Sequence, residues 1–119
     1  MTEVTLYGIR TCDSVRRARR WLDARGIGYR WHDLREDGVP EERLRAWCEA
    51  PGWERILNRR STTWRQLPAA ARADLDPGRA RALMAAHPTL IRRPVLEADA
   101  QVLVGFDEQA YRQVLGTQR

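Results

Sequence analysis

The segment Val4–Arg20, with the sequence VTLYGIRTCDSVRRARR, decides how the rest of the chain is interpreted. A short run of β-branched and apolar residues ends at Gly8, a three-residue loop follows, and Cys12 stands directly before a strongly basic segment. This pattern predicts a strand over residues 3–8 and a helix over residues 13–25. Cys12 is therefore expected at a strand-to-helix turn.

The position of Cys12 favours a reactive cysteine. The first turn of a helix has unpaired backbone N–H groups and the positive end of the helix dipole, and both favour a thiolate over a thiol. Arg10 and Arg16 lie two residues before and four residues after Cys12, and we expect them to add positive potential there. The alternative is a buried structural role, which is common for free cysteines. The loop–helix junction favours the reactive role.

The first part of the chain predicts a β-α-β unit. Residues 28–34 alternate aromatic and polar side chains, which indicates a second strand. A strand–helix–strand order of this length is typical of two parallel strands joined by a right-handed crossover.

The remaining segments predict helices and then a return to strands. Residues 37–87 contain several apolar helical stretches interrupted by proline, and residues 87–96 are expected to be extended. Residues 95–97 and 101–104 predict an antiparallel hairpin, which a last helix follows after Asp107.

This order of elements, β-α-β, helices and β-β-α, predicts an α/β protein with a thioredoxin-like fold, a mixed sheet and an inserted helical subdomain. Residues 1–36 and 88–119 are assigned to the thioredoxin-like domain. Residues 37–87 are assigned to the helical insertion.

Length and cysteine content narrow the class of protein. A chain of 119 residues can bury a real core in one domain. It has no apolar run near 18 residues and no apolar N-terminal signal, so a cytoplasmic protein without a membrane partner is expected. Cys12 and Cys48 are too few for a disulfide scaffold, and with His32 and His87 they do not make a zinc site. Cys48 is expected in the core.

The net positive charge does not by itself indicate a nucleic-acid partner. The net charge is +5, but all 21 basic residues are Arg, which indicates a chain-wide bias in composition. Most arginines of the segment 16–20 share a helix with Val15, Ala18 and Leu22, and we interpret them as its solvated face. No nucleic-acid partner is therefore expected.

Motifs along nearly the whole chain form a specific combination. They are Tyr7-Gly8-Ile9 with Thr11-Cys12-Asp13, Ala18-Arg19-Arg20-Trp21-Leu22, His32-Asp33, Leu57-Asn58 with Arg60, Thr62-Thr63-Trp64-Arg65, Arg92-Arg93-Pro94 and Gly105-Phe106. With these motifs the chain resembles the ArsC/Spx family of thioredoxin-fold proteins, and most closely its YffB-like branch. The resemblance implies a reductase-like thiol protein with Cys12 as the nucleophile. It also implies that Arg93, before a cis-proline at Pro94, helps to hold an oxyanion and that Arg60 faces the thiol.

The departures from the family pattern bear on the activity. Gly8 stands where arsenate reductases of the family usually carry a histidine, and Asn58 and Gly105 stand where they carry arginines. These departures disfavour arsenate reduction. The regulator branch commonly has a C-x-x-C switch, but here Val15 takes the place of the second cysteine, which disfavours a regulator.

The function expected from these observations is a thiol-dependent reductase with one nucleophilic cysteine and a glutathione-linked, monothiol mechanism. A glutaredoxin-dependent arsenate reductase and a non-enzymatic Spx-like regulator or adaptor are the alternatives. No bound cofactor is expected. The expected partners of this monomeric protein are glutathione, with glutaredoxin as a further candidate, and a small oxyanion or disulfide substrate. Thr11 is expected to cap the helix and to donate to the thiolate, so both a structural and a catalytic role are open for it. The substrate-binding residues are predicted to be Thr11, Asn58, Arg60, Arg93, Pro94 and Gly105.

Overall fold

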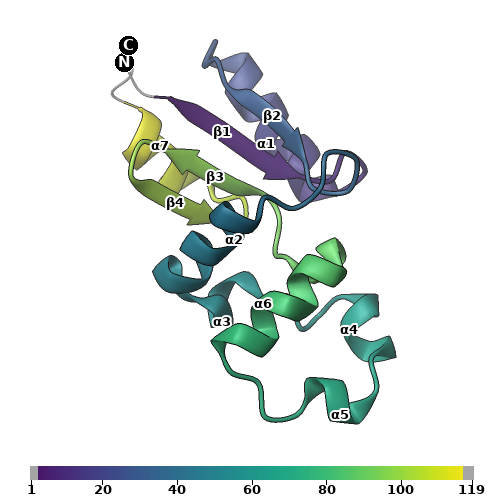
Figure 1. Cartoon of the computed structure of the whole chain (residues 1–119). Helices are drawn as coiled ribbons and strands as arrows, with labels where there is room; N and C mark the ends of the chain where they lie inside the picture. Colours follow the sequence, from purple (N-terminus) through teal and green to yellow (C-terminus); the bar gives the residue numbers. More distant parts are fainter. Residues whose placement is uncertain (1–2, 117–119) are drawn as a thin grey trace. The chain divides into compact units, whose positions relative to one another are not determined.

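The computed structural model describes residues 3–116, which form two compact units (Figure 1). The first, called the α/β unit below, contains the described residues up to Asp37 and those from Arg93 onward. The second, called the helical unit, is Gly38–Arg92.

The α/β unit is built on a four-stranded sheet in the order β2-β1-β3-β4. The strands are β1 (Val4–Gly8), β2 (Arg30–Asp33), β3 (Val95–Ala98) and β4 (Gln101–Val104). β1 runs parallel to β2 and antiparallel to β3, and β3 runs antiparallel to β4. This mixed sheet confirms the predicted thioredoxin-like topology.

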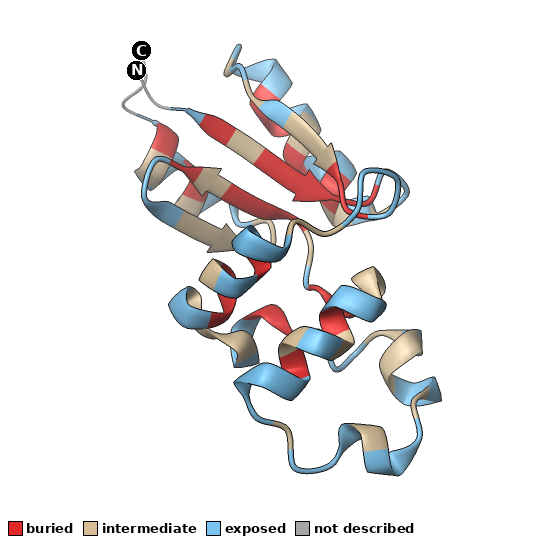
Figure 2. Cartoon of the chain, in the orientation of Figure 1, coloured by how far each residue is buried: buried red, intermediate tan, exposed pale blue. Residues whose placement is uncertain are grey.

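Two helices, α1 (Asp13–Ala24) and α7 (Glu108–Leu115), supply the core on one side of this sheet. Alternate residues of β1 and β3 point toward the helices, because successive side chains of a strand face opposite sides. Figure 2 shows the resulting contrast between the mostly buried strands β1 and β3 and the more exposed edge strands. The core residues are Val4, Leu6, Ala18, Trp21, Leu22, Leu96, Ala98, Tyr111 and Leu115.

The apolar spacing of α1 explains why this segment is helical, and a glycine marks where the helix ends. Val15, Ala18, Trp21 and Leu22 are all buried, as a helix with one apolar face requires. The chain leaves the helix at Gly26, whose positive φ of 66° is a conformation that glycine adopts without steric cost.

The helical unit consists of short helices, as the interruptions in the sequence predict. Two of them begin at a side-chain cap: Ser61 Oγ accepts from Trp64 N, and Asp76 Oδ1 accepts from Arg79 N. Its elements are α2 (Glu41–Trp47), the π-helical η1 (Cys48–Gly52), α3 (Trp53–Ile56), α4 (Thr62–Gln66), α5 (Ala69–Arg72), α6 (Pro77–Ala86) and the 3₁₀ helix η2 (Pro88–Leu90).

The segment 87–96 differs from the extended structure that the sequence analysis predicts. Residues 88–90 form η2, because Pro88 suits the first position of a turn and Leu90 N donates to His87 O. Asn58 N donates to Leu90 O and Arg92 N donates to Ile56 O, so this segment packs within the helical unit. The chain enters the α/β unit again at Arg93.

Over residues 3–116, none of the helices has the length and apolar character needed to cross a membrane.

Candidate active site

Cys12 is the N-cap residue of α1. Its backbone is extended, with φ −79° and ψ 128°, and its side chain is half-buried. Its N–H donates to Ile9 O at 3.0 Å, and its carbonyl accepts from Arg16 N at 3.0 Å. An N-cap side chain lies where an acceptor can bind the unpaired N–H groups of the first turn. The Cys12 side chain stands at this position and makes no capping hydrogen bond in this structure.

The expectation that Thr11 caps this helix is wrong. Thr11 is exposed and precedes the cap residue by one position, because α1 begins at Asp13. Thr11 belongs instead to the loop that leads into Cys12.

The two arginines near Cys12 are engaged with carboxylates. Arg10 lies 3.4 Å from Glu36 Oε1, and Arg16 lies 3.2 Å from Asp13 Oδ1. All four side chains are exposed, so solvent screens their charges. These pairs offset part of the positive potential expected from the two arginines.

Pro94 and Gly105 lie at the edge of the sheet from which the Cys12 loop departs. The Arg93–Pro94 peptide bond is cis, and Pro94 directly precedes Val95, which pairs with Tyr7 of β1 and Val104 of β4. Gly105 N donates to Pro94 O at 2.8 Å, which extends the pairing of β3 and β4 by one step. The loop that carries Cys12 starts after Gly8, at the same edge.

Gly105 adopts a positive φ of 80°, which residues with a Cβ rarely adopt. An arginine at this position would therefore be strained.

Asn58 and Arg60 lie together in one turn of the helical unit. Asn58 Oδ1 accepts from Arg60 N at 3.0 Å, and Asn58 N donates to Leu90 O at 2.7 Å. The Arg60 side chain is exposed. The Asn58 side chain thus supports the turn that presents Arg60. Of the predicted site residues, Thr11, Cys12, Arg93, Pro94 and Gly105 belong to the α/β unit, and Asn58 and Arg60 to the helical unit.

Cys48 has the properties of a structural cysteine. Its side chain is 7% exposed, and burial raises the pKa of its thiol, an effect that outweighs the nearby charge of Arg81. A buried thiol with a raised pKa is a poor nucleophile.

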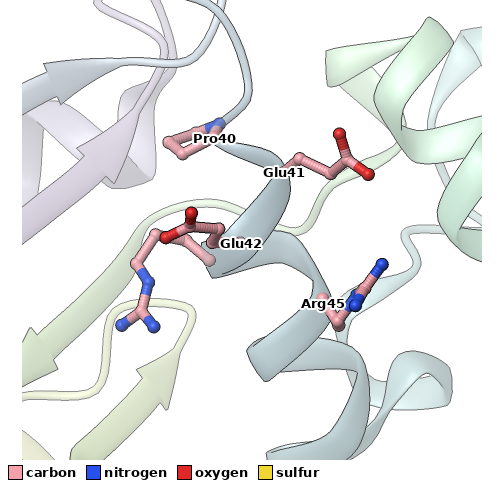
Figure 3. A pocket seen from close by; sticks show the side chains of 5 residues that line it. Pro40, Glu41, Glu42 and Arg45 are labelled. Atoms are coloured by element: carbon pink, nitrogen blue, oxygen red, sulfur yellow. The ribbon is translucent and has the colours of Figure 1, made fainter.

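A pocket at the start of α2 contains none of the predicted site residues, and carboxylate and guanidinium side chains line it (Figure 3). Its lining residues are Pro40, Glu41, Glu42, Arg43 and Arg45. Within residues 3–116, no group of three or more His, Cys, Asp and Glu side chains is arranged to hold a metal ion.

One residue outside the predicted set contacts the Cys12 loop. Asp33, the last residue of β2, accepts from Arg10 N through Oδ2. The sequence signal for it is an aspartate at the end of a strand and the start of a polar turn, where its side chain can bind following backbone N–H groups. That signal predicts a local turn but not the contact with residue 10.

The comparisons with known proteins show the family of this chain. The sequence matches the ArsC family over residues 7–114. A solved structure of the YFFB (PA3664) protein is 46% identical, with a TM-score of 0.91, over 94% of this chain and 98% of that one.

Two other known proteins are also similar to this chain. The solution structure of an arsenate reductase (ArsC) related protein from Brucella melitensis is 42% identical, with a TM-score of 0.74, over 93% of this chain and 92% of that one. The global transcriptional regulator Spx of Lactiplantibacillus plantarum is 28% identical, over 94% of this chain and 86% of the regulator. These matches confirm the resemblance on which the sequence analysis relied, and the chain belongs to the ArsC family.

Proposed function

We propose that this protein is a thiol oxidoreductase that uses Cys12 as its single nucleophile and glutathione as its co-substrate. The observation that carries the proposal is the place of Cys12, half-buried at the N-cap of α1, on a loop that starts at the sheet edge where Pro94 precedes β3. Membership of a family with an arsenate reductase related protein among its solved structures supports thiol chemistry.

The proposed reaction has two exchange steps. The Cys12 thiolate attacks a sulfur of a disulfide substrate, a new S–S bond forms, and the other sulfur leaves as a thiolate. Glutathione thiolate then attacks this mixed disulfide. When the substrate carries glutathione, the second step releases oxidised glutathione and restores the Cys12 thiolate. In the net reaction, one added glutathione thiol reduces the substrate's mixed disulfide to a thiol and leaves as oxidised glutathione, joined to the glutathione that the substrate carried, so no second protein thiol is required.

Arg93 and Pro94 are proposed to bind the co-substrate. Arg93 directly precedes Pro94 and is half-buried in the α/β unit, and a guanidinium group can bind a carboxylate through two hydrogen bonds. Pro94 is proposed to present neighbouring backbone groups to the extended glutathione peptide. Arg60, exposed on its turn, is proposed as a second anion-binding group.

Intact mass after treatment with oxidised glutathione tests the proposal. We expect one adduct on the wild-type protein and on Cys48→Ser, and none on Cys12→Ser. Cys48→Ser is the matched control, because it removes the other thiol of the chain. An adduct that persists in Cys12→Ser, or a wild-type protein whose free Cys12 takes no glutathione, would contradict the proposal.

Arsenate reduction is the second candidate, because a relative 42% identical over most of this chain is described as arsenate reductase related. Arsenate-dependent oxidation of glutathione, in the presence of glutaredoxin, distinguishes this activity from disulfide exchange. A regulator of the Spx kind is the third, supported by the 28% identity to Spx. It predicts binding to an RNA polymerase subunit that persists in Cys12→Ser, with no turnover of either substrate.

A further inference from the structure

A buried carboxylate lies at the end of the strand that neighbours the Cys12 loop. Asp33 is 2% exposed, and it is the buried charged side chain among residues 3–116. A carboxylate removed from water costs free energy unless it is paired or hydrogen-bonded. The groups that bind it therefore indicate its role.

The Asp33 carboxylate joins two loops. Its Oδ2 accepts from Arg10 N at 3.3 Å, in the loop that leads into Cys12. Its Oδ1 accepts from Arg35 N at 2.8 Å and Glu36 N at 2.9 Å, in the turn that follows β2. Three backbone N–H groups on two segments thus bind one side chain, which is an arrangement that a free acidic surface residue does not make.

Further contacts run between the same two loops. Leu34 N donates to Gly8 O at 2.8 Å, and the exposed Arg10 side chain reaches Glu36 at 3.4 Å. Within the Cys12 loop, Cys12 N donates to Ile9 O, so the position of Cys12 depends on residues 9 and 10. Among these contacts, Asp33 supplies the side-chain link from a buried residue, whereas the Arg10–Glu36 pair is exposed.

We propose that Asp33 is a positioning residue for Cys12, an inference that rests on the proposed function. It holds the backbone of residues 9–12, so that Cys12 stays at the N-cap of α1 with its sulfur in one orientation. A large disulfide, which must approach the sulfur along one direction, depends on this orientation. Asp33 makes no step of the reaction itself.

Asp33→Asn separates this role from the local turn. An asparagine oxygen can still accept from Arg35 N and Glu36 N, which keeps the turn after β2. Its amide N–H₂ would then face Arg10 N–H, donor against donor, and the link to the Cys12 loop is lost. Asp37→Asn is the matched control, because the Asp37 carboxylate accepts from Asp33 N at 3.1 Å in the same turn. This bond lies outside the Cys12 loop.

The test compares two reagents on Cys12 in a Cys48→Ser background. One is oxidised glutathione, which is large and anionic, and the other is iodoacetamide, which is small and neutral. A change in the thiolate fraction or in global stability alters both rates together, so their ratio reports the positioning of Cys12. We expect the glutathione-to-iodoacetamide ratio to fall about tenfold in Asp33→Asn and to stay at the wild-type value in Asp37→Asn.

The direction of the change in the reagent ratio distinguishes positioning from an effect of charge. Loss of a negative charge would by itself accelerate reaction with an anionic disulfide, so a lower ratio does not arise from charge. Amide hydrogen exchange is expected to accelerate at Arg10 and Cys12 in Asp33→Asn, without the same change along α7. Should Asp33→Asn not fold, Asp33→Ser keeps a short acceptor for the local turn and serves the same comparison.

The possible failures are distinct. A wild-type protein without a glutathione adduct contradicts the proposed function, and the exchange rates at Arg10 and Cys12 then still report whether Asp33 holds the loop. An adduct on the wild type with an unchanged reagent ratio in Asp33→Asn contradicts the positioning role alone.

Discussion

Gly8 at the end of β1 lies directly against Val15 of α1. A Cβ placed on Gly8 would be 2.6 Å from Val15 Cγ2, closer than two carbon atoms can approach without movement. Val15 is fully buried and β-branched, so it cannot rotate away freely. The absence of a side chain at position 8 thus sets how closely α1, with Cys12 at its start, approaches the sheet.

Gly8→Ala is therefore expected to destabilise the protein by about 1–3 kcal/mol, the usual cost of overpacking. Val15→Ala removes the atoms that clash, so the double variant should lose less stability than the sum of the two single variants. Urea unfolding of the four proteins measures this coupling. Strictly additive losses would show that Gly8 and Val15 do not compete for the same space.

Arg93→Ala should slow glutathionylation of Cys12 more than Arg92→Ala does. The proposed function places Arg93 at the anionic co-substrate, whereas Arg92 donates from Nε to Arg55 O in the helical unit. Removal of a bidentate anion contact typically costs about 1.5–3 kcal/mol, or roughly a tenfold to hundredfold lower rate at low glutathione. Equal rates for the two alanine variants would assign Arg93 a structural role.

Asp33 should make the free energy of unfolding depend on pH in the acidic range. Burial raises the pKa of Asp33, but the N–H donors of Glu36, Arg35 and Arg10 and the charge of Arg10 outweigh it, so the pKa lies below its ordinary value of 3.8. Because the folded-state pKa is the lower one, the contribution is fully present above the unfolded-state pKa. It is lost as the pH falls through the folded-state value.

Asp33→Asn should accordingly be less stable than the wild type at pH 7 by about 1–3 kcal/mol, the cost of an unsatisfied buried donor. The difference should begin to shrink below the unfolded-state pKa of about 4, where the unfolded chain takes up the proton first, and should continue to shrink as the pH falls through the lower folded-state pKa. Urea midpoints measured from pH 7 to pH 2 check this, and a gap of constant size across that range would contradict it.

Tyr111→Phe should leave the protein as stable or make it more stable. The Tyr111 hydroxyl is buried without a hydrogen-bond partner among residues 3–116, and burial raises the pKa of this phenol. The ring packs edge-on against Trp21 and Phe106, with centroids 5.6 Å and 5.1 Å away, and phenylalanine keeps both contacts. An unsatisfied buried hydroxyl costs about 1–3 kcal/mol of stability, and Tyr111→Phe should regain part of that free energy. A thermal melt with a clearly lower Tm would indicate that the hydroxyl has a partner.

The local parts of the fold were predictable because their causes are local. The spacing of Val15, Ala18 and Leu22 specifies a helix with one apolar face, and Asp76 before Pro77 specifies where α6 begins. The 3₁₀ turn at 88–90 differs from the extended structure that the sequence predicts, because beside its local bond from Leu90 N to His87 O it accepts a hydrogen bond from Asn58 N, far away in the chain. Thr11 was misjudged by one position, because the sequence does not state which residue of a loop becomes the cap.

The sequence by itself determined the thioredoxin-like order of elements, the family and the candidate nucleophile Cys12, since these depend on periodicity, spacing and motif. Only the tertiary structure decided which groups surround that cysteine. Strand pairing brings Pro94 and Gly105 to the edge where the Cys12 loop starts, and the burial of Asp33 ties this loop to a turn more than twenty residues away. Such contacts follow from register and from the need of a buried carboxylate for hydrogen-bond donors, and neither leaves a pattern among neighbouring residues.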